Sequence, residues 1–365
     1  MDRMSSRSEE PIDAIVLAGT KGAKTIELDG QNVYKPLLEI GGEPLVMKVT
    51  RAVLGAKIIG KVYVVGQIEP LKKALAPLIE QVPDRISLVP EGADILDNGY
   101  RTFFRTLLPD RGLGAPESPH LDPPVLADYR DKTPAAVRMP VFVVTSDLPF
   151  LSSGAIDRFI ELDTGKAAVM FGLVDYRELD KMRAVIGEQT VLDQWKLGAI
   201  HFRRISVRMG NMFLLRPLLG DPALYTLLLD LYAHRWLLKQ DGSVHWRNWW
   251  AITKSMIGYS VKAAGWVRFL RGLVNFVPAM IAASLARLTH RVGRWLSWPF
   301  RLFVSKNDVQ FIGSTMIAAQ GHLAVTKDPG PAIDIDVKES YLSLVKDGEK
   351  DFRRIDGYLK ENLPD

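Results

Sequence analysis

Short runs of β-branched residues alternate with longer helical patterns in the first half of this chain. The runs Ala14–Leu17, Lys61–Val65 and Val141–Thr145 suit strands that are buried on both faces. Leu45–Ile59 and Glu69–Gln81 have helical spacing, and each ends near a glycine or proline. Such alternation predicts an α/β domain with a mostly parallel sheet and right-handed crossovers. Ligands of open parallel sheets bind beyond the carboxyl ends of the strands, so we expect functional residues there.

Composition narrows the class of protein and its compartment. The chain has 365 residues, of which 47% are hydrophobic and 24% charged, as is typical of a folded globular protein. It contains no cysteine, which excludes a disulfide framework, a thiolate metal site and a cysteine nucleophile. The N-terminus lacks the apolar region of a secretory signal. We therefore expect a disordered tail over residues 1–10 and a cytoplasmic protein.

Charge is distributed unevenly, and this divides the chain. Between His234 and Lys306 there are 12 Lys or Arg residues against one acidic residue, and seven of the eight tryptophans lie there too. Two compositions in one chain indicate two different roles. We predict an α/β domain over residues 11–221, a basic, tryptophan-rich helical insertion over 222–312, and a segment over 313–365 that completes the α/β domain.

A proline-rich stretch interrupts the alternation of strands and helices. Seven prolines lie within Pro109–Pro140. Because long connections without secondary structure are uncommon in compact domains, we expect either a functional loop or a disordered insertion here.

A loop rich in glycine and lysine follows the first strand. It contains Gly19 and Gly22, and Lys21, Lys24 and Lys35 lie in it or after it. Backbone N–H groups of such a loop can approach phosphate oxygens closely, and the lysines would add positive charge for a polyphosphate. The alternative is an ordinary turn between a strand and a helix, with solvated lysines. Neither the Walker A pattern nor the G-x-G-x-x-G dinucleotide fingerprint is present.

Carboxylates follow two strand-like runs. Asp147 lies just after Val141–Thr145, at the expected carboxyl edge of the sheet. Asp334 and Asp336 end a run that we predict to be a short strand before a helix. Carboxylate oxygens at such an edge are suited to hold Mg²⁺ against a triphosphate. Each aspartate has an alternative role as the cap of a turn or of the following helix.

Together these stretches resemble a known family of enzymes. Leu17–Lys24 matches the opening motif L-A-A-G-x-G-x-R of nucleotidyltransferases of the sugar-1-phosphate, molybdenum-cofactor and isoprenoid-precursor type. Lys35 begins a match to K-x-L-x-x-x-x-G-x-P, and the late motif of the form D-x-D-x-P-E-x or D-T-G-T-x-E-S-L matches Asp334–Tyr341. The resemblance covers residues 11–221 and 313–365. It implies a GT-A-like α/β fold, with a Rossmann-type, mostly parallel sheet flanked by helices and interrupted by the helical insertion.

The sequence departs from the family pattern around the opening loop. Thr20 stands where the second glycine usually is, and Tyr34 replaces the proline before Lys35. Lys24 replaces an arginine, although lysine cannot form a bidentate fork to phosphate. The spacing between Lys24 and Lys35 also exceeds the common form. These departures leave the nucleotide preference and the rate open.

The resemblance implies roles for individual residues. Lys24 and Lys35 would be catalytic. Asp147 and Asp334 would hold Mg²⁺, with Asp336 as a rival to Asp334. The nucleotide-binding residues would be Leu17, Ala18, Gly19, Thr20, Lys21, Gly22, Asn98 and Gly99, the last two in a loop that contacts the base and ribose. Gly210 and Asn211 would face the acceptor substrate.

The implied reaction transfers an NMP from an NTP to a phosphorylated acceptor and releases pyrophosphate, with Mg²⁺ as cofactor. Positioning and neutralisation of charge would supply most of the catalysis. Two alternatives remain open, namely a GT-A glycosyltransferase that uses a sugar nucleotide and a membrane-recruited nucleotide-binding module with weak or no catalysis. The glycine and lysine loop with Lys35 favours a triphosphate. The base, the acceptor and homo-oligomer formation are open at this point.

The basic insertion resembles a helix that lies at a membrane surface. Its longest uncharged run, Gly272–Ala286, is shorter than the roughly 20 residues needed to span a bilayer. Arg287, Arg291 and Arg294 share one helical face. The opposite face carries Leu285, Leu288, Val292 and Leu296, with Trp295 at the boundary.

We expect residues 236–301 to contact an anionic membrane surface, which would place the protein at the inner face of the membrane. A lipid precursor would then be a candidate acceptor. Packing within the protein or against a second subunit is the alternative. Nucleic acid is the least favoured partner, because the aromatic residues accompany aliphatic runs and not a polar groove.

Overall fold

The computed structural model describes most of the chain. It describes residues 10–20, 26–28, 30–118, 121–186, 199–234, 246–267, 293–316, 319–335 and 338–363, with single positions between 268 and 292. Residues 1–9 of the predicted tail, and the opening-loop residues Lys21, Gly22 and Lys24, lie outside the described residues, as does Asp336.

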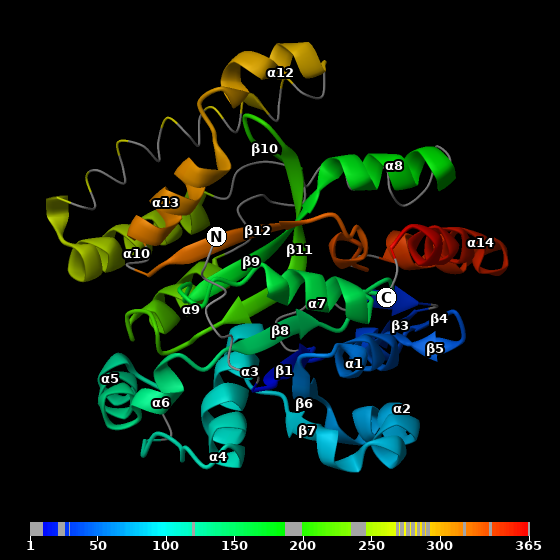
Figure 1. The fold of residues 1–365 in the computed structure, drawn as a ribbon, viewed down its shortest axis with the longest axis horizontal. Helices are drawn as coiled ribbons and strands as arrows, with labels where there is room; N and C mark the ends of the chain where they lie inside the picture. The colour runs from blue at the N-terminus through cyan, green and yellow to red at the C-terminus, as the bar shows by residue number, and fades with distance from the viewer. Residues whose placement is uncertain are drawn as a thin grey trace, which may run out of the picture.

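Eight strands form one central mixed sheet (Figure 1). They are β1 (Ile12–Leu17), β6 (Ile59–Gly66), β7 (Ile86–Pro90), β8 (Val141–Thr145), β9 (Val169–Asp175), β10 (Ile200–His201), β11 (Ser206–Leu215) and β12 (Gly321–Thr326). Their order is β12-β9-β11-β8-β1-β6-β7, with β10 paired to β11. β11 is antiparallel to β8 and β9, while the other pairs on this path are parallel. The predicted mostly parallel α/β sheet is confirmed.

The sheet is covered by helices on both faces because neighbouring residues of its strands alternate between two apolar cores. Val16, Val64 and Val144 pack in the core beneath one set of helices, which are α1 (Leu45–Gly55), α2 (Ile68–Gln81) and α7 (Ser153–Glu161). Their neighbours Ile15 and Val143 pack in the other core. The helices of that face are α3 (Ile95–Thr102), α4 (Leu108–Asp110), α5 (Pro123–Lys132) and α9 (Leu224–Ala233), with a π-helical turn at Phe103–Leu107.

Smaller elements gather at the carboxyl ends of the strands. They are the hairpins β2 (Ile26–Leu28) with β3 (Gln31–Val33) and β4 (Glu39–Ile40) with β5 (Glu43–Pro44), the 3-10 turns η1 (Lys35–Leu37) and η5 (Gly330–Ala332), and the helices α8 (Tyr176–Ile186) and α14 (Lys338–Asn362). A further 3-10 turn, η2 (Pro83–Arg85), precedes β7. A separate apolar cluster ties these elements together, with Phe150, Ile333 and Phe352 among its members. In Figure 1 they lie on the right, at the edge where β8 and β12 end.

The described part of the predicted insertion is helical. It contains α9, α10 (Trp246–Ala264), α12 (Arg294–Arg301) and the start of α13 (Lys306–Met316). Val309 of α13 packs on the sheet with Leu173 and Val207, so this part of the chain covers the β9–β12 side. β12, which follows, pairs in parallel with β9 at the edge of the sheet.

The proline-rich stretch differs from both expectations, because much of it is helical. α5 begins at Pro123 and α6 (Pro134–Val137) begins at Pro134. Proline is compatible with the first turn of a helix, where the missing N–H would have had no intrahelical partner. Leu126 and Tyr129 of α5 are buried in the core beneath the sheet.

Two other predicted elements need correction. The helix that we expected over Leu45–Ile59 ends at Gly55, because Ile59 already begins β6. The strand that we expected before Asp334 does not form in the described residues. Ile333 and Ile335 are both buried, which explains their strand-like alternation with Asp334. However, the segment follows a 3-10 turn at Gly330–Ala332, and its backbone bond runs from Ile335 N–H to the Asp147 carbonyl at 3.1 Å.

Candidate active site at the carboxyl edge of the sheet

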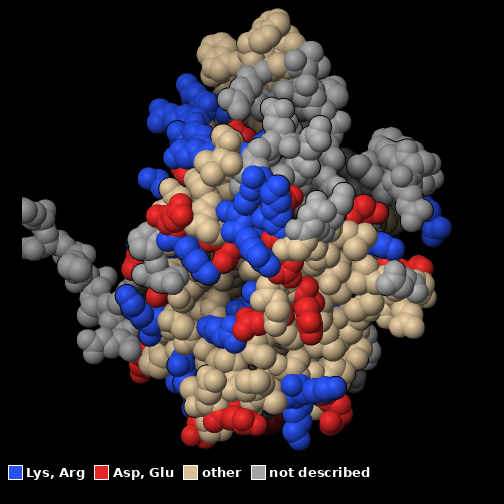
Figure 2. All heavy atoms as spheres, turned by 90° about the vertical axis from the view of Figure 1, so that its right-hand side faces the viewer, with Lys and Arg blue, Asp and Glu red and all other residues tan. Residues whose placement is uncertain are grey.

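The predicted site residues come together where the parallel strands end. Leu17, Gly66 and Thr145 lie at the carboxyl ends of β1, β6 and β8, and the antiparallel β11 begins at the same edge with Ser206. Figure 2 looks onto this side of the molecule and shows Lys and Arg side chains interleaved with Asp and Glu near the middle of the face. This edge is therefore polar and carries both signs of charge.

Lys35 and Asp147 form the first ion pair of the edge. The Lys35 Nζ lies 2.5 Å from Asp147 Oδ2, and the Thr145 hydroxyl donates to Asp147 Oδ1 at 2.5 Å. The two charged side chains are 17% and 15% exposed, so the pair is shielded but open to a ligand. Asp147 is the second residue after β8, while Lys35 is placed by the 3-10 turn at Lys35–Leu37.

Asp334 forms the second pair, with Arg208 of β11. Arg208 Nη2 lies 3.1 Å from Asp334 Oδ1, and the Asn211 amide donates to Asp334 Oδ2 at 3.0 Å. A side chain on Gly210 would meet Pro331 at about 3.3 Å, so the strand and the 3-10 turn approach closely here. The structure thus joins the predicted metal ligand Asp334 to the predicted acceptor-facing residue Asn211.

The two pairs are neighbours, because the Ile335 N–H donates to the Asp147 carbonyl. Two carboxylates and a hydroxyl supply the hard oxygen donors that Mg²⁺ prefers, and Mg²⁺ sites for nucleotides commonly use one or two carboxylates plus phosphate oxygens. Asp147 and Asp334 fit that chemistry. Within the described part of the chain, no group of three or more His, Cys, Asp or Glu residues could hold a metal ion.

The opening loop is described as far as Thr20, whose backbone is held by a carboxylate. The Thr20 N–H donates to Glu91 Oε2 at 2.7 Å, and the Gln67 amide donates to the Thr20 hydroxyl at 3.4 Å. A side chain on Gly19 would meet the Asn98 amide nitrogen at 2.5 Å and Glu91 Oε2 at 3.0 Å. Gly19 therefore packs closely against these two side chains, and the loop lies against the ends of β6 and β7.

Tyr34, which replaces the family proline, joins two strand ends. Its hydroxyl donates to the Ala18 carbonyl at 2.6 Å and accepts from the Gln67 N–H at 3.1 Å. Burial raises the pKa of Tyr34 to about 12, so the hydroxyl stays protonated and keeps its donor role. The departure from the family pattern thus adds a link between β1 and β6 beside Lys35.

Asn98 and Gly99 lie within helix α3 and not in the loop where we expected them. Asp94 caps this helix by accepting from the N–H groups of Leu96 and Asp97, so the helix begins before Asn98. Asn98 is 2% exposed and accepts from the Gly92 N–H, and its amide nitrogen faces Gly19. Gly99 has open space around it, so no neighbour requires a glycine.

Three polar residues of the edge were missed from the sequence. Arg208 sits two positions before the Gly-Asn pair that we did single out, and Thr145 is the last residue of a predicted strand. Glu91 directly follows β7, a strand of five residues that we did not predict. A carboxylate directly after a short apolar run is the signal that would have identified Glu91.

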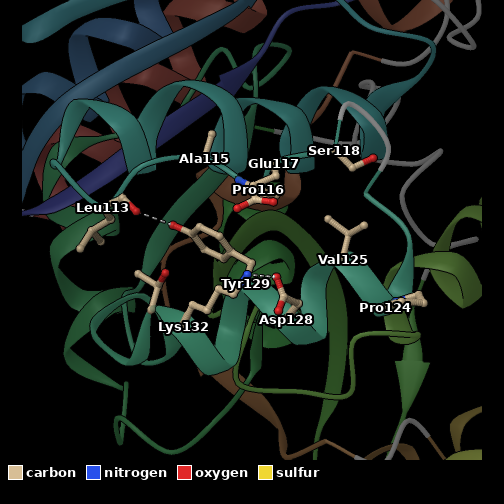
Figure 3. Close-up of a pocket in the computed structure, with 11 residues that line it drawn as sticks. Leu113, Ala115, Pro116, Glu117, Ser118, Pro124, Val125, Asp128, Tyr129 and Lys132 are labelled. Carbon is tan, nitrogen blue, oxygen red and sulfur yellow. Dashed lines mark hydrogen bonds and ion pairs between the residues drawn. The ribbon is translucent and has the colours of Figure 1, made fainter.

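A separate cavity of about 440 Å³ lies between residues 113–118 and α5 (Figure 3). The Tyr129 hydroxyl crosses it and donates to the Leu113 carbonyl at 3.0 Å, and Lys132 pairs with Asp128 at 2.8 Å. None of the described residues that line the cavity belongs to the carboxyl-edge site. The polar edge and this cavity are therefore distinct features.

A family model identifies the class of protein that this fold and site define. The model of the MobA-like NTP transferase domain matches residues 14–237, which is more than half of the chain. The chain belongs to this family and is a nucleotidyltransferase, so the predicted family and enzyme class are confirmed. Of the three functions considered from the sequence, the family favours a nucleotidyltransferase over a sugar-nucleotide glycosyltransferase or a nucleotide-binding module.

Solved structures resemble the chain only distantly. A hypothetical transferase from Thermus thermophilus has a TM-score of 0.47 at 19% identity and covers 91% of this chain and 99% of its own. The 4-diphosphocytidyl-2C-methyl-D-erythritol synthase from Anaerococcus prevotii has a TM-score of 0.34 at 12% identity, over 67% and 96%. A CMP:2-keto-3-deoxy-manno-octonic acid synthetase complexed with CTP has a TM-score of 0.32 at 10% identity and covers 62% of this chain and 86% of its own. No curated protein sequence matches significantly. The family assignment rests on the family model.

Proposed function

We propose that this nucleotidyltransferase transfers an NMP from an NTP to a phosphorylated acceptor, depends on Mg²⁺ and releases pyrophosphate. The observation that carries the proposal is the pairing of two neighbouring carboxylates with two cations, Lys35 with Asp147 and Arg208 with Asp334. Both pairs lie at the edge where nucleotides bind in open α/β sheets. They lie beside the loop that matches the opening family motif.

Asp147 and Asp334 would hold the ion, with Asp336 as the rival that lies outside the described residues. Bound Mg²⁺ would offset the negative charge of the triphosphate and acceptor. With the carboxylates neutralised, Lys35 would turn to the α-phosphate or the attacking oxygen. The Arg208 guanidinium would turn to the acceptor, where its planar fork suits a phosphate.

The opening loop would bind the leaving part of the nucleotide. Backbone N–H groups from Leu17 to Gly22 would donate to the β- and γ-phosphates, and Lys24 would add charge. Glu91 occupies the Thr20 N–H in this structure, so a triphosphate would have to displace that carboxylate. Asn98 would support the loop through Gly19, while Gly210 and Asn211 would face the acceptor.

The domain organisation is part of the proposal. Residues 11–221 and 313–365 would form the catalytic domain, with 222–312 inserted into it. The pairing of β12 with β9 supports this division, since residues on both sides of the insertion share one sheet. The family match ends at residue 237, somewhat beyond the proposed boundary.

Pyrophosphate release tests the reaction. Each of the four NTPs would be combined with Mg²⁺ and a panel of phosphorylated sugars, isoprenoid precursors and lipid-linked phosphates. We expect release that needs both one NTP and one acceptor, and that is lost in Asp147→Asn. Release from NTP alone, unaffected by this substitution, would contradict the proposal.

Metal binding has its own readout. Paramagnetic Mn²⁺, as a probe for the Mg²⁺ site, should bind the protein in the presence of NTP, and Asp147→Asn should weaken that binding. Equal Mn²⁺ binding by the parent protein and by variants of both Asp147 and Asp334 would remove these two residues from the proposed site.

A further inference from the structure

Helix α12 has its apolar face turned outward. Trp295, Trp298 and Leu302 are 77%, 61% and 37% exposed, and Phe303, next in the chain, is 70% exposed. Trp295, Trp298 and Leu302 follow a spacing of three to four residues, so they share one side of the helix. An amphipathic helix of a soluble domain normally buries this side. The exposed side of α12 is thus a contiguous aromatic surface.

The opposite side of α12 is fixed to the rest of the protein. Ser297 is fully buried, and the Arg301 guanidinium donates to the Phe202 carbonyl at 2.9 Å and to the Ser206 hydroxyl at 3.2 Å. Phe202 and Ser206 flank the turn between β10 and β11, at the carboxyl edge of the sheet. These bonds hold the polar side inward, and the aromatic side consequently faces away from the protein.

A basic cleft lies beside this helix. It has a volume of about 490 Å³, and Arg203, Arg204 and Lys306 line it. No described residue of its lining is acidic. The Arg203 N–H donates to the Val304 carbonyl at 2.7 Å, which joins the β10–β11 turn to the segment between α12 and α13. Ser305 caps α13, because its hydroxyl accepts from the Asp308 N–H at 3.0 Å, and the Asp308 carboxylate accepts from the Ser305 N–H in return.

We propose that the outer face of α12 and the basic cleft form a docking surface for an anionic lipid bilayer. Tryptophan favours the interface between water and hydrocarbon, and an exposed apolar helix face beside cations is the arrangement of interfacial helices. Arg203, Arg204 and Lys306 complement lipid phosphates in charge. In Figure 2, Lys and Arg side chains gather in the upper part of the face, at the height of α12 and β10 in Figure 1. This inference does not depend on the proposed reaction.

The surface differs in detail from the sequence expectation. Arg287, Leu288, Arg291 and Val292 of the expected helix lie outside the described residues. The face that the structure exposes begins at Trp295 and extends beyond Arg301 to Phe303. In the described part of the chain, no helix is long and apolar enough to cross a bilayer.

Charge disfavours a second copy of this chain as the occupant. A two-fold contact across α12 would bring like surfaces together, so Arg203, Arg204 and Lys306 would approach their own counterparts. Between His234 and Lys306 the sequence has 12 basic residues and one acidic residue, which adds repulsion between copies. An anionic bilayer is attracted by the same charges.

Vesicle co-sedimentation tests the proposal with the full chain. The probes are phosphatidylcholine vesicles with and without phosphatidylglycerol. We expect binding that requires phosphatidylglycerol and weakens with salt. Trp298→Ser combined with Phe303→Ser, and separately Arg203→Glu combined with Arg204→Glu, should each weaken it by about tenfold or more. These side chains are exposed, so circular dichroism should be unchanged.

A matched control distinguishes binding through the proposed surface from an effect of the protein's net charge. Arg353→Glu combined with Arg354→Glu makes the same charge change on α14, where both arginines are exposed, and should retain most of the binding. Equal losses in the two arginine pairs would overturn the proposal in favour of general charge attraction. Absence of binding to either vesicle would also overturn it, as would a self-association that the Trp298 and Phe303 substitutions abolish.

Discussion

The two edges of the central sheet both carry ion pairs, but they bury them differently. At the edge where the parallel strands begin, Asp13 is 1% exposed beneath Arg111, and Arg216 and Asp163 are 5% and 9% exposed. At the opposite edge, Asp147 and Asp334 are each 15% exposed. The carboxylates Asp13 and Asp163 of the first edge are almost fully buried, while Asp147 and Asp334 of the second remain accessible to a ligand.

Backbone groups account for much of this difference. Asp13 also accepts from the Lys61 N–H at 2.9 Å, and Arg216 also donates to the Ala167 carbonyl at 3.1 Å. Side chains of Thr145 and Asn211 hold the carboxylates of the other edge, and side chains can turn to a new partner. The same kind of pair therefore serves stability at one edge, and we expect it to serve binding and turnover at the other.

The largest effect on stability is expected at the edge where the parallel strands begin. Arg216→Leu would leave Asp163 without its buried cation and should lower the free energy of unfolding by about 3–5 kcal/mol. Chemical denaturation measures this. NTP binding at a temperature where the variant is folded should stay unchanged, and a loss of binding there would remove the distinction between the edges.

A double variant sharpens that result. Arg216→Leu combined with Asp163→Leu removes both charges, and it should recover much of the lost stability because no unpaired charge remains buried. A double variant as unstable as the single one would point to packing and not to charge.

Asp147→Asn should have the converse effect at the open edge. We expect turnover to fall by about two to three orders of magnitude, because the ligand charge and the partner of Lys35 are lost. Stability should fall by less than in Arg216→Leu, since Lys35 and Asp147 are more exposed than Arg216 and Asp163. Pyrophosphate release and thermal unfolding of the same preparation give both values.

Substitutions of two glycines distinguish the role of the opening loop from that of helix α3. Gly19→Ala would press on Asn98 and Glu91 and should cost about 1–3 kcal/mol, divided between stability and NTP affinity. Gly99→Ala has open space in a helix and should be neutral or stabilising by up to about 1 kcal/mol. Calorimetric NTP titration measures affinity, and weaker binding by Gly99→Ala would restore a direct role for that residue.

Tyr34→Phe tests the link between β1 and β6. Loss of the hydroxyl leaves the Ala18 carbonyl and the Gln67 N–H without this partner, so we expect a loss of roughly 1–2 kcal/mol in unfolding free energy. The KM for NTP should rise while kcat changes less, because the loop position changes and not the reacting groups. A kcat loss as large as that of Asp147→Asn would contradict this assignment.

The smallest effect concerns pH. Burial, together with the charge of Lys306, lowers the pKa of His322 at the start of β12 below its usual value of 6.5. The folded state therefore disfavours the protonated ring, and stability should fall as pH drops below about 6.5. In chemical denaturation at several pH values from about 8 to about 5, His322→Gln should reduce the fall in unfolding free energy over this range by a fraction of 1 kcal/mol. An unchanged fall would assign the pH dependence to other groups.

Much of the sheet could be predicted because burial leaves a local trace in the sequence. β8 matches its predicted bounds, and β1 and β6 extend the predicted runs by a few residues. The helices α1 and α2 were also found, with an error at the end of α1. Two other elements were not predicted correctly. β7 was missed, and the strand expected before Asp334 proved to be an irregular segment whose two isoleucines are buried.

For the site, the family motifs located both members of the first pair, Lys35 and Asp147, but only Asp334 of the second, and they did not reveal the pairing. Lys35 and Asp147 are 112 residues apart, and Arg208 and Asp334 are 126 apart. Asn98 and Gly99 were placed in a loop, because the capping role of Asp94 was overlooked. The domain boundaries and the roles of all the predicted site residues remain predictions, and Lys21, Gly22, Lys24 and Asp336 also lie outside the described residues.

The sequence by itself determined the α/β class, the family and the loops that meet at one sheet edge, because short-range patterns record burial and backbone geometry. Only the tertiary structure decided which charges face each other, since contacts across more than 100 residues leave no local trace. It also decided which side of α12 faces outward. Amphipathic spacing defines two faces of a helix, but the packing of Ser297 and Arg301 against the protein selects the one that stays exposed.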